Sequence, residues 1–326
     1  MQVPIYRLLT FVVAVCLTMA SARAQTFPSR PIRIIVPWPA GAVDIFIRAM
    51  QEPMQQDLGQ PIIIENKPGA NGFIGSMLAS ASKPDGYTLL FNVSSSIVMG
   101  PLTSTEAKFD VQKDFSPITN VFNTPMVLVG KPTLPATTLP ELIEWLRRNP
   151  RQGYGSPGIG SMPHLLGETL KIAAKVDITH VAYRGFVPMI QAVTGDEIAV
   201  GFIAVATAKP MIIAGRMNVF GVDRGPVNDA DLAHLPSLPA ALPGFDSAPT
   251  FAGLWAPAGT PQPIVDRVNA AAVKALAIPQ IRAKVELGGQ TAVGDRPEAF
   301  AATIKQNVET SARLVEAAKA AGAKFE

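Results

Sequence analysis

Three loops hold the residues whose types and spacing could bind a small molecule. Residues 37–44 (PWPAGAVD), 92–96 (NVSSS) and 156–161 (SPGIGS) each combine glycine or serine with the start of a predicted helix. Free backbone N–H groups and the positive end of a helix favour an anion such as a carboxylate. None of the three loops contains Lys or Arg, so neutral hydrogen bonds are expected. The alternative is that these residues only satisfy turn and cap geometry.

Residues that could catalyse a reaction are few. The three histidines, His164, His180 and His234, lack the spacing of metal ligands. Ser161 and His164 are the one candidate nucleophile–base pair of an exported hydrolase, but they do not form a G-x-S-x-G motif. For His164 we favour a hydrogen bond at a helix start or in a pocket. We therefore predict no enzymatic activity, no cofactor and no bound metal.

The first 24 residues have the pattern of a cleaved export signal. Arg7 precedes the apolar run 8–20, and Ala-Arg-Ala at 22–24 fits a cleavage site. The run of 13 residues is too short to cross a bilayer of roughly 30 Å as a helix. We expect cleavage after Ala24 and a periplasmic mature chain.

Composition limits the class of protein further. The 326 residues are 48% apolar and 16% charged, which excludes a disordered chain. Without Arg7 and Arg23 of the signal, 26 basic residues face 25 acidic ones, so we expect no nucleic-acid partner. The single cysteine, Cys16, also lies in the signal, and the mature chain is predicted to have no disulfide.

The predicted elements that position the loops alternate between strands and helices. Strand 32–36 leads to a helix that has Asp44 as its N-cap and that Pro53 should kink or interrupt. A capping box at residues 138–141 opens another helix. The other expected strands are 62–64, 87–91, 126–129, 178–183, 198–202, 218–222 and 251–256, and the last helix is 297–321.

Several ordered motifs resemble one family. They are PIRIIVP at 31–37, NKPGA at 66–70, PDGYTLL at 84–90, KDFSP at 113–117 and APAGTP at 256–261. The chain is similar in these motifs to the Bug family of periplasmic solute-binding receptors, which serve tripartite tricarboxylate transporters.

The resemblance implies an α/β, two-lobe type II periplasmic-binding-protein fold, with a mainly parallel sheet and flanking helices in each lobe. Lobe 1 would comprise residues 25–123 and 250–326, and lobe 2 residues 124–249. Such a protein captures a small carboxylate and delivers it to integral-membrane permease subunits, and we expect a monomer. The implied ligand-binding residues are Trp38, Ala40, Gly41, Ala42, Asp44, Ser94, Ser95, Ser156, Gly160, Ser161, His164 and Tyr183.

Two departures from the family pattern bear on the ligand. The first loop is one glycine short, because Ala42 follows Gly41 directly, and an Asp that often follows strand 198–202 is missing. Four apolar residues are expected near the cleft, so we predict an aromatic or otherwise apolar monocarboxylate; they are Trp38, Met162, Phe186 and Met189. Alternatives are a ligand-responsive signalling receptor, the exported hydrolase, and a receptor that has lost binding.

Overall fold

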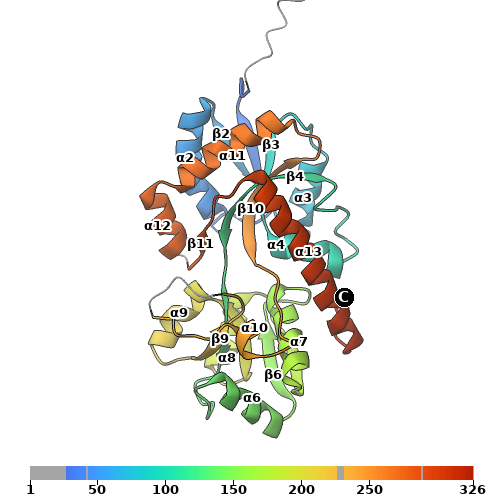
Figure 1. Ribbon diagram of the computed structural model, residues 1–326, viewed down its shortest axis with the longest axis vertical. Helices are drawn as coiled ribbons and strands as arrows, with labels where there is room; N and C mark the ends of the chain where they lie inside the picture. The colour runs from blue at the N-terminus through green and yellow to red at the C-terminus, as the bar shows by residue number, and fades with distance from the viewer. Residues whose placement is uncertain (1–26, 42, 226–230, 288, 326) are drawn as a thin grey trace, which may run out of the picture.

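The computed structural model describes residues 27–41, 43–225, 231–287 and 289–325, which form two lobes (Figure 1). One lobe contains a six-stranded sheet of order β11-β4-β10-β3-β1-β2, and the other a five-stranded sheet of order β7-β6-β8-β5-β9. The predicted two-lobe α/β fold is therefore confirmed. The predicted signal peptide and Ala42 lie outside the described residues.

The elements of the first lobe are β1 (Ile32–Val36), α2 (Asp44–Leu58), β2 (Ile62–Asn66), the short 3-10 helix η1 (Ala70–Gly72), α3 (Phe73–Ser80), β3 (Thr88–Val93), α4 (Ser94–Ile97), α5 (Met99–Thr103) and β4 (Phe115–Asn123). Those of the second lobe are β5 (Met126–Gly130), α6 (Leu139–Arg148), β6 (Gln152–Ser156), α7 (Met162–Ala174), β7 (Ile178–Ala182), α8 (Phe186–Thr194), β8 (Val200–Ala204), α9 (Val205–Ile213), β9 (Asn218–Val222) and α10 (Leu238–Ala241). The chain then returns with β10 (Phe251–Pro257), α11 (Gln262–Leu276), α12 (Pro279–Leu287), β11 (Thr291–Ala292) and α13 (Pro297–Ala320).

Strand direction is mainly parallel in both sheets. β1, β2 and β3 are parallel, and β4 shares their direction because β10 is antiparallel to both β3 and β4. In the second sheet β6, β7 and β8 are parallel, and β5 is antiparallel to β8 and β9. Strands β5, β10 and β11 run in the reverse direction, and β5 and β10 are the first strands after each passage between the lobes.

Helix α2 follows the apolar stripe that the sequence predicts. Its buried residues include Phe46, Met50, Met54 and Leu58, and Gly59, with a left-handed φ of 71°, is its C-cap. Of the kink or interruption expected at Pro53, the interruption does not occur, because the helix continues from Asp44 to Leu58 with Pro53 inside it. Spacing every fourth residue places one apolar face on the sheet, and that packing holds the helix together.

Two neighbouring segments connect the lobes. Thr124, after β4, donates its N–H to the carbonyl oxygen of Thr250 at 2.7 Å, just before β10. Strands β4 and β10, which adjoin these segments, pair antiparallel and run side by side in Figure 1. We propose that the lobes divide here, at the predicted boundaries 123/124 and 249/250.

Helix α13 packs on both lobes. Phe300 and Ile304 near its start join the apolar core of the first lobe. Leu314, Val315 and Ala318 near its end join the core of the second. Figure 1 shows the helix running from one lobe along the side of the other. No helix in the described ranges is long and apolar enough to cross a membrane.

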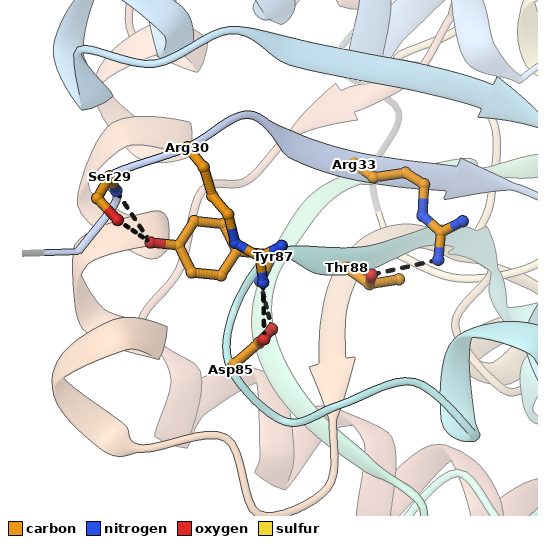
Figure 2. Close-up of polar contacts among 6 residues, drawn as sticks. All are labelled: Ser29, Arg30, Arg33, Asp85, Tyr87 and Thr88. Atoms are coloured by element: carbon orange, nitrogen blue, oxygen red, sulfur yellow. Dashed lines mark hydrogen bonds and ion pairs between the residues drawn. The ribbon is translucent and has the colours of Figure 1, made fainter. Parts of the chain in front are cut away.

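The first described residues lie at the end of lobe 1 remote from lobe 2 (Figure 1), and the polar contacts drawn in Figure 2 hold them there. The N–H of Ser29 donates to the Tyr87 hydroxyl at 2.9 Å. The Arg30 guanidinium lies 4.1 Å from the centre of the Tyr87 ring and pairs with Asp85 at 3.0 Å. Arg33 donates to the Thr88 hydroxyl at 3.3 Å.

Candidate functional site

A cavity of about 800 Å³ lies between the lobes. Both lobes supply its walls, as expected for a ligand site that closes around a small molecule. Its residues from the first lobe and the connections are Trp38, Val43, Ala70, Asn71, Phe73, Val93, Ser95, Thr103, Ser104, Glu106, Thr124 and Thr250. Those from the second lobe and the C-terminus are Met126, Pro157, Gly158, Ile159, Ser161, Met162, Pro163, Gly185, Phe186, Ala204 and Phe325.

Trp38 is a lining residue held by two hydrogen bonds. Its indole N–H donates to Oδ1 of Asn92 at 2.9 Å, and its carbonyl oxygen accepts from Nδ2 of Asn66 at 2.9 Å. Both asparagines lie at carboxyl ends of parallel strands, where the sheet positions the loops. The apolar ring of Trp38 therefore has a fixed place beside the cavity.

Asp44 stabilises the first loop rather than lining the cavity. It is buried, and its Oδ1 accepts the N–H of Gly41 at 2.8 Å while Oδ2 accepts Nε of Arg48 at 2.6 Å. Burial acts to raise its pKa, but the bonds from Arg48 and Gly41 outweigh this and lower it. Asp44 is the first residue of α2 and Val43 is the N-cap, so the predicted N-cap role is wrong. Ala40 and Gly41 are exposed and outside the lining.

Replacing Asp44 with Ala should loosen this loop. The N–H of Gly41 and the guanidinium of Arg48 would lose their acceptor, and we expect the free energy of unfolding to fall by about 1–3 kcal/mol. Urea unfolding measures it. Asp44→Asn is the matched control, because it keeps an oxygen for Gly41. Equal losses in both variants would assign the effect to the charge and contradict the role of the loop bond.

The serine triplet divides between cavity and core. Ser95 lines the cavity. The Ser94 hydroxyl oxygen is buried and accepts the N–H of Phe251 at 3.1 Å, which ties α4 to β10. Ser96 is buried too, and its Oγ accepts from Asn92 at 3.2 Å. The three serines form a short helix instead of the expected loop end, so they point in different directions.

The loop of the second lobe places the start of α7 at the cavity. Ser161 lines the cavity and caps the helix, since its Oγ accepts the N–H of His164 at 3.4 Å and donates to the Gly158 carbonyl at 2.7 Å. Ser156 and Gly160 are buried outside the lining. Ile159, on the lining between them, is 52% exposed.

The histidines form a stacked pair beneath this loop. The rings of His164 and His180 lie 3.8 Å apart and are nearly parallel. Burial lowers the pKa of each to about 4. Neutral His164 can accept the N–H of Gly160 at 3.2 Å through Nδ1. The expected hydrogen bond at a helix start is therefore present, and His164 supports the loop from outside the lining.

The candidate Ser161–His164 nucleophile–base pair of the hydrolase alternative does not form, because Ser161 accepts the backbone N–H of His164 and does not contact its ring. A hydroxyl–imidazole pair that the sequence did not indicate does exist: Ser156 Oγ lies 2.7 Å from Nε2 of His180. Ser156 is completely buried, so a substrate in the cavity cannot reach it. Tyr183 packs with Met189 in the second-lobe core, and neither residue lines the cavity.

Charge is scarce on the cavity wall. Glu106 is the only charged side chain among the described lining residues. The neutral polar ones are Asn71, Ser95, Thr103, Ser104, Thr124, Ser161 and Thr250. Asn71 could have been expected from the loop after β2, whereas the connection threonines and Phe325 carry no sequence signal. Within the described ranges no three His, Cys, Asp or Glu side chains form a possible metal site.

Comparison with known proteins agrees with this architecture. Residues 46–319 match the sequence profile of the Tripartite tricarboxylate transporter family receptor. A UPF0065 protein of Pseudomonas sp. (strain P51) is 33% identical over 314 residues, which covers 93% of this chain and 91% of that protein. A solved structure described as a periplasmic transporter is 35% identical, with a TM-score of 0.76, and the match covers 92% of this chain and 100% of that one.

A second solved structure contains a ligand. MatC from Rhodopseudomonas palustris with bound malate is 26% identical, with a TM-score of 0.72, and the match covers 89% of this chain and 100% of that one. The profile match spans most of this chain, and the structural likeness spans both lobes. The chain therefore belongs to the receptor family of the tripartite tricarboxylate transporters.

Proposed function

We propose that this protein is a periplasmic receptor that captures a small carboxylate between its lobes and delivers it to a membrane permease. The observation that carries this is the cavity with Ser161 and the first turn of α7 on its wall. The side chain of Ser161 already accepts the N–H of His164, and Pro163 has no backbone N–H. The N–H of Met162 is therefore the first-turn donor that we assign to the ligand. This neutral N–H and the helix dipole there favour a carboxylate.

The lining favours an acid with one carboxylate and an apolar body. Trp38, Phe73, Met162 and Phe186 supply apolar surface. Glu106 would repel a second carboxylate, and no Lys or Arg appears among the described lining residues to offset it. A monocarboxylate such as benzoate avoids that repulsion, whereas malate or citrate does not.

Export and delivery complete the proposal. The leader predicted at residues 1–24 and the periplasmic relatives support a periplasmic location. We infer that the mature chain acts as a monomer, without cofactor or turnover, and that it releases ligand to the integral-membrane subunits of its transporter. The buried Ser156 supports the absence of hydrolysis.

A ligand panel on the refolded mature chain tests the function. Refolding removes any acid carried through purification. Benzoate, cyclohexanecarboxylate, hexanoate, malate and citrate are compared by thermal shift, and a ligand at 100 times its dissociation constant should add about 2.7 kcal/mol of stability. We expect shifts from the monocarboxylates and none from benzamide, the uncharged counterpart of benzoate. Shifts only from malate or citrate would overturn the monocarboxylate proposal. No shift from any acid, in a chain that melts cooperatively, would overturn the receptor function.

A further inference from the structure

The described segment after α13 reaches the ligand cavity through Phe325. After α13, Gly322 adopts a φ of 93°, its N–H donates to Lys319 O at 2.9 Å, and the N–H of Ala323 donates to Ala318 O at 2.9 Å. This hydrogen-bond pair is a Schellman motif, which ends a helix and turns the chain away from its axis. The turn directs Phe325 to the cavity wall.

Phe325 is the residue that this turn places at the cavity. It lines the cavity and is only 8% exposed. Its ring lies 4.8 Å from the ring of His164, which stacks in turn on His180 at 3.8 Å. Phe325 therefore rests on the same rings that support the Ser161 loop.

The neighbouring helix end fixes Phe325 relative to lobe 2. Leu314, Val315 and Ala318 of α13 pack in the same apolar cluster as Phe325 and as Leu165 of α7. Here one continuous apolar core holds the ring beside the start of α7.

We propose that Phe325 is a specificity-determining residue, an aromatic wall that the C-terminus adds to the ligand cavity and that favours carboxylates with a flat aromatic body. This rests on the proposed function, since it concerns the ligand bound in the same cavity. Ring pairs prefer offset or edge-to-face contacts at 4.5–7 Å, which an aliphatic side chain cannot reproduce. The ring should thus distinguish benzoate from cyclohexanecarboxylate, which is of similar size but not aromatic.

The test measures dissociation constants by calorimetry for the refolded mature chain and three variants. Phe325→Leu keeps an apolar side chain without the ring, Phe325→Ala removes most of the wall, and Lys324→Ala is the exposed neighbouring control. We expect the preference for benzoate over cyclohexanecarboxylate to fall about three- to tenfold in Phe325→Leu, and to stay unchanged in Lys324→Ala. Phe325→Ala should weaken both acids.

The outcomes separate the two proposals. If the unaltered chain binds both acids and Phe325→Leu keeps the same ratio, the role of Phe325 is overturned while the receptor function stands. If the unaltered chain melts cooperatively but binds neither acid, the monocarboxylate proposal fails and the inference fails with it. If Phe325→Ala does not fold, the ratio of the two dissociation constants in Phe325→Leu still decides whether Phe325 sets the preference for benzoate.

Discussion

Replacing Ser161 with Asp is expected to abolish carboxylate binding while leaving the fold intact. Asp is as good an N-cap as Ser, so α7 keeps its cap. Its carboxylate, however, would lie on the cavity wall where we place the carboxylate of the ligand. Two such charges about 4 Å apart repel by about 4 kcal/mol at an effective dielectric constant of 20, so the loss of affinity should exceed a hundredfold. Calorimetry with benzoate measures this loss, and melting of the free protein measures the fold.

Ser161→Asn is the control for this experiment. Asn also caps helices well but adds no charge, so its affinity should stay within about tenfold of the unaltered protein. If Ser161→Asp still binds benzoate tightly, the carboxylate does not lie at the start of α7. The carboxylate of the ligand would then bind to the first-lobe groups near Ser95 and Asn71. A lower melting temperature in Ser161→Asp alone would show instead that the cap had failed.

A second large effect is expected at Asp223, which follows β9 beside the connection between the lobes. Asp223 is 2% exposed, and its carboxylate accepts the N–H of Met126 at 2.9 Å. Burial raises its pKa from 3.8 to about 7. The folded protein therefore binds this proton more tightly than the unfolded chain does. Below about pH 4 the carboxyl group is protonated in both states, and its burial does not lower the free energy of unfolding. Above pH 7 it is ionised in both states, and the loss of stability from burying its charge is complete.

The variant Asp223→Asn should remove this pH dependence. A shift of about three pKa units corresponds to about 4 kcal/mol, so relative to the unaltered protein the variant should gain about that much stability between pH 4 and pH 8. Urea unfolding at both pH values gives the free energy of unfolding of the variant relative to the unaltered protein. Any pH-independent loss of stability caused by the Asn amide cancels when the two pH values are compared. Asp177→Asn, at an exposed carboxylate, is the control. If Asp223→Asn has the same pH profile as the unaltered protein, Asp223 does not titrate in this range.

The fold was predictable where strands are continuous apolar runs. β1 and β9 have the expected bounds. β1 lies between two parallel neighbours, and a buried parallel strand needs apolar residues on both faces. The pattern does not indicate β4, which contains Pro117 and several polar residues. Pro117 lies opposite Trp255 next to a register shift, the kind of position where a sheet tolerates proline. β11 has two residues and α10 four, too few for any periodicity.

The site was less predictable than the fold. The rule that loops meet at the carboxyl ends of strands places Trp38, Ser95 and Ser161 at the cavity. The rule does not say which way a side chain points, so Ser94 and Asp44 were also expected at the cavity. Both side chains are instead buried, where they accept hydrogen bonds from the backbone N–H groups of Phe251 and Gly41. Phe325 meets His164 only because α13 packs against lobe 2, a tertiary contact that no local pattern encodes.

The exposure of Ile159 on the cavity wall has a practical consequence. The single cysteine of the chain is Cys16, in the segment that we expect to be removed on export. Ile159→Cys would therefore give the mature protein one thiol, placed where the lobes approach each other. A polarity-sensitive dye on that thiol would change its emission as the cavity fills, and the receptor would become a reagentless optical sensor for its own ligand.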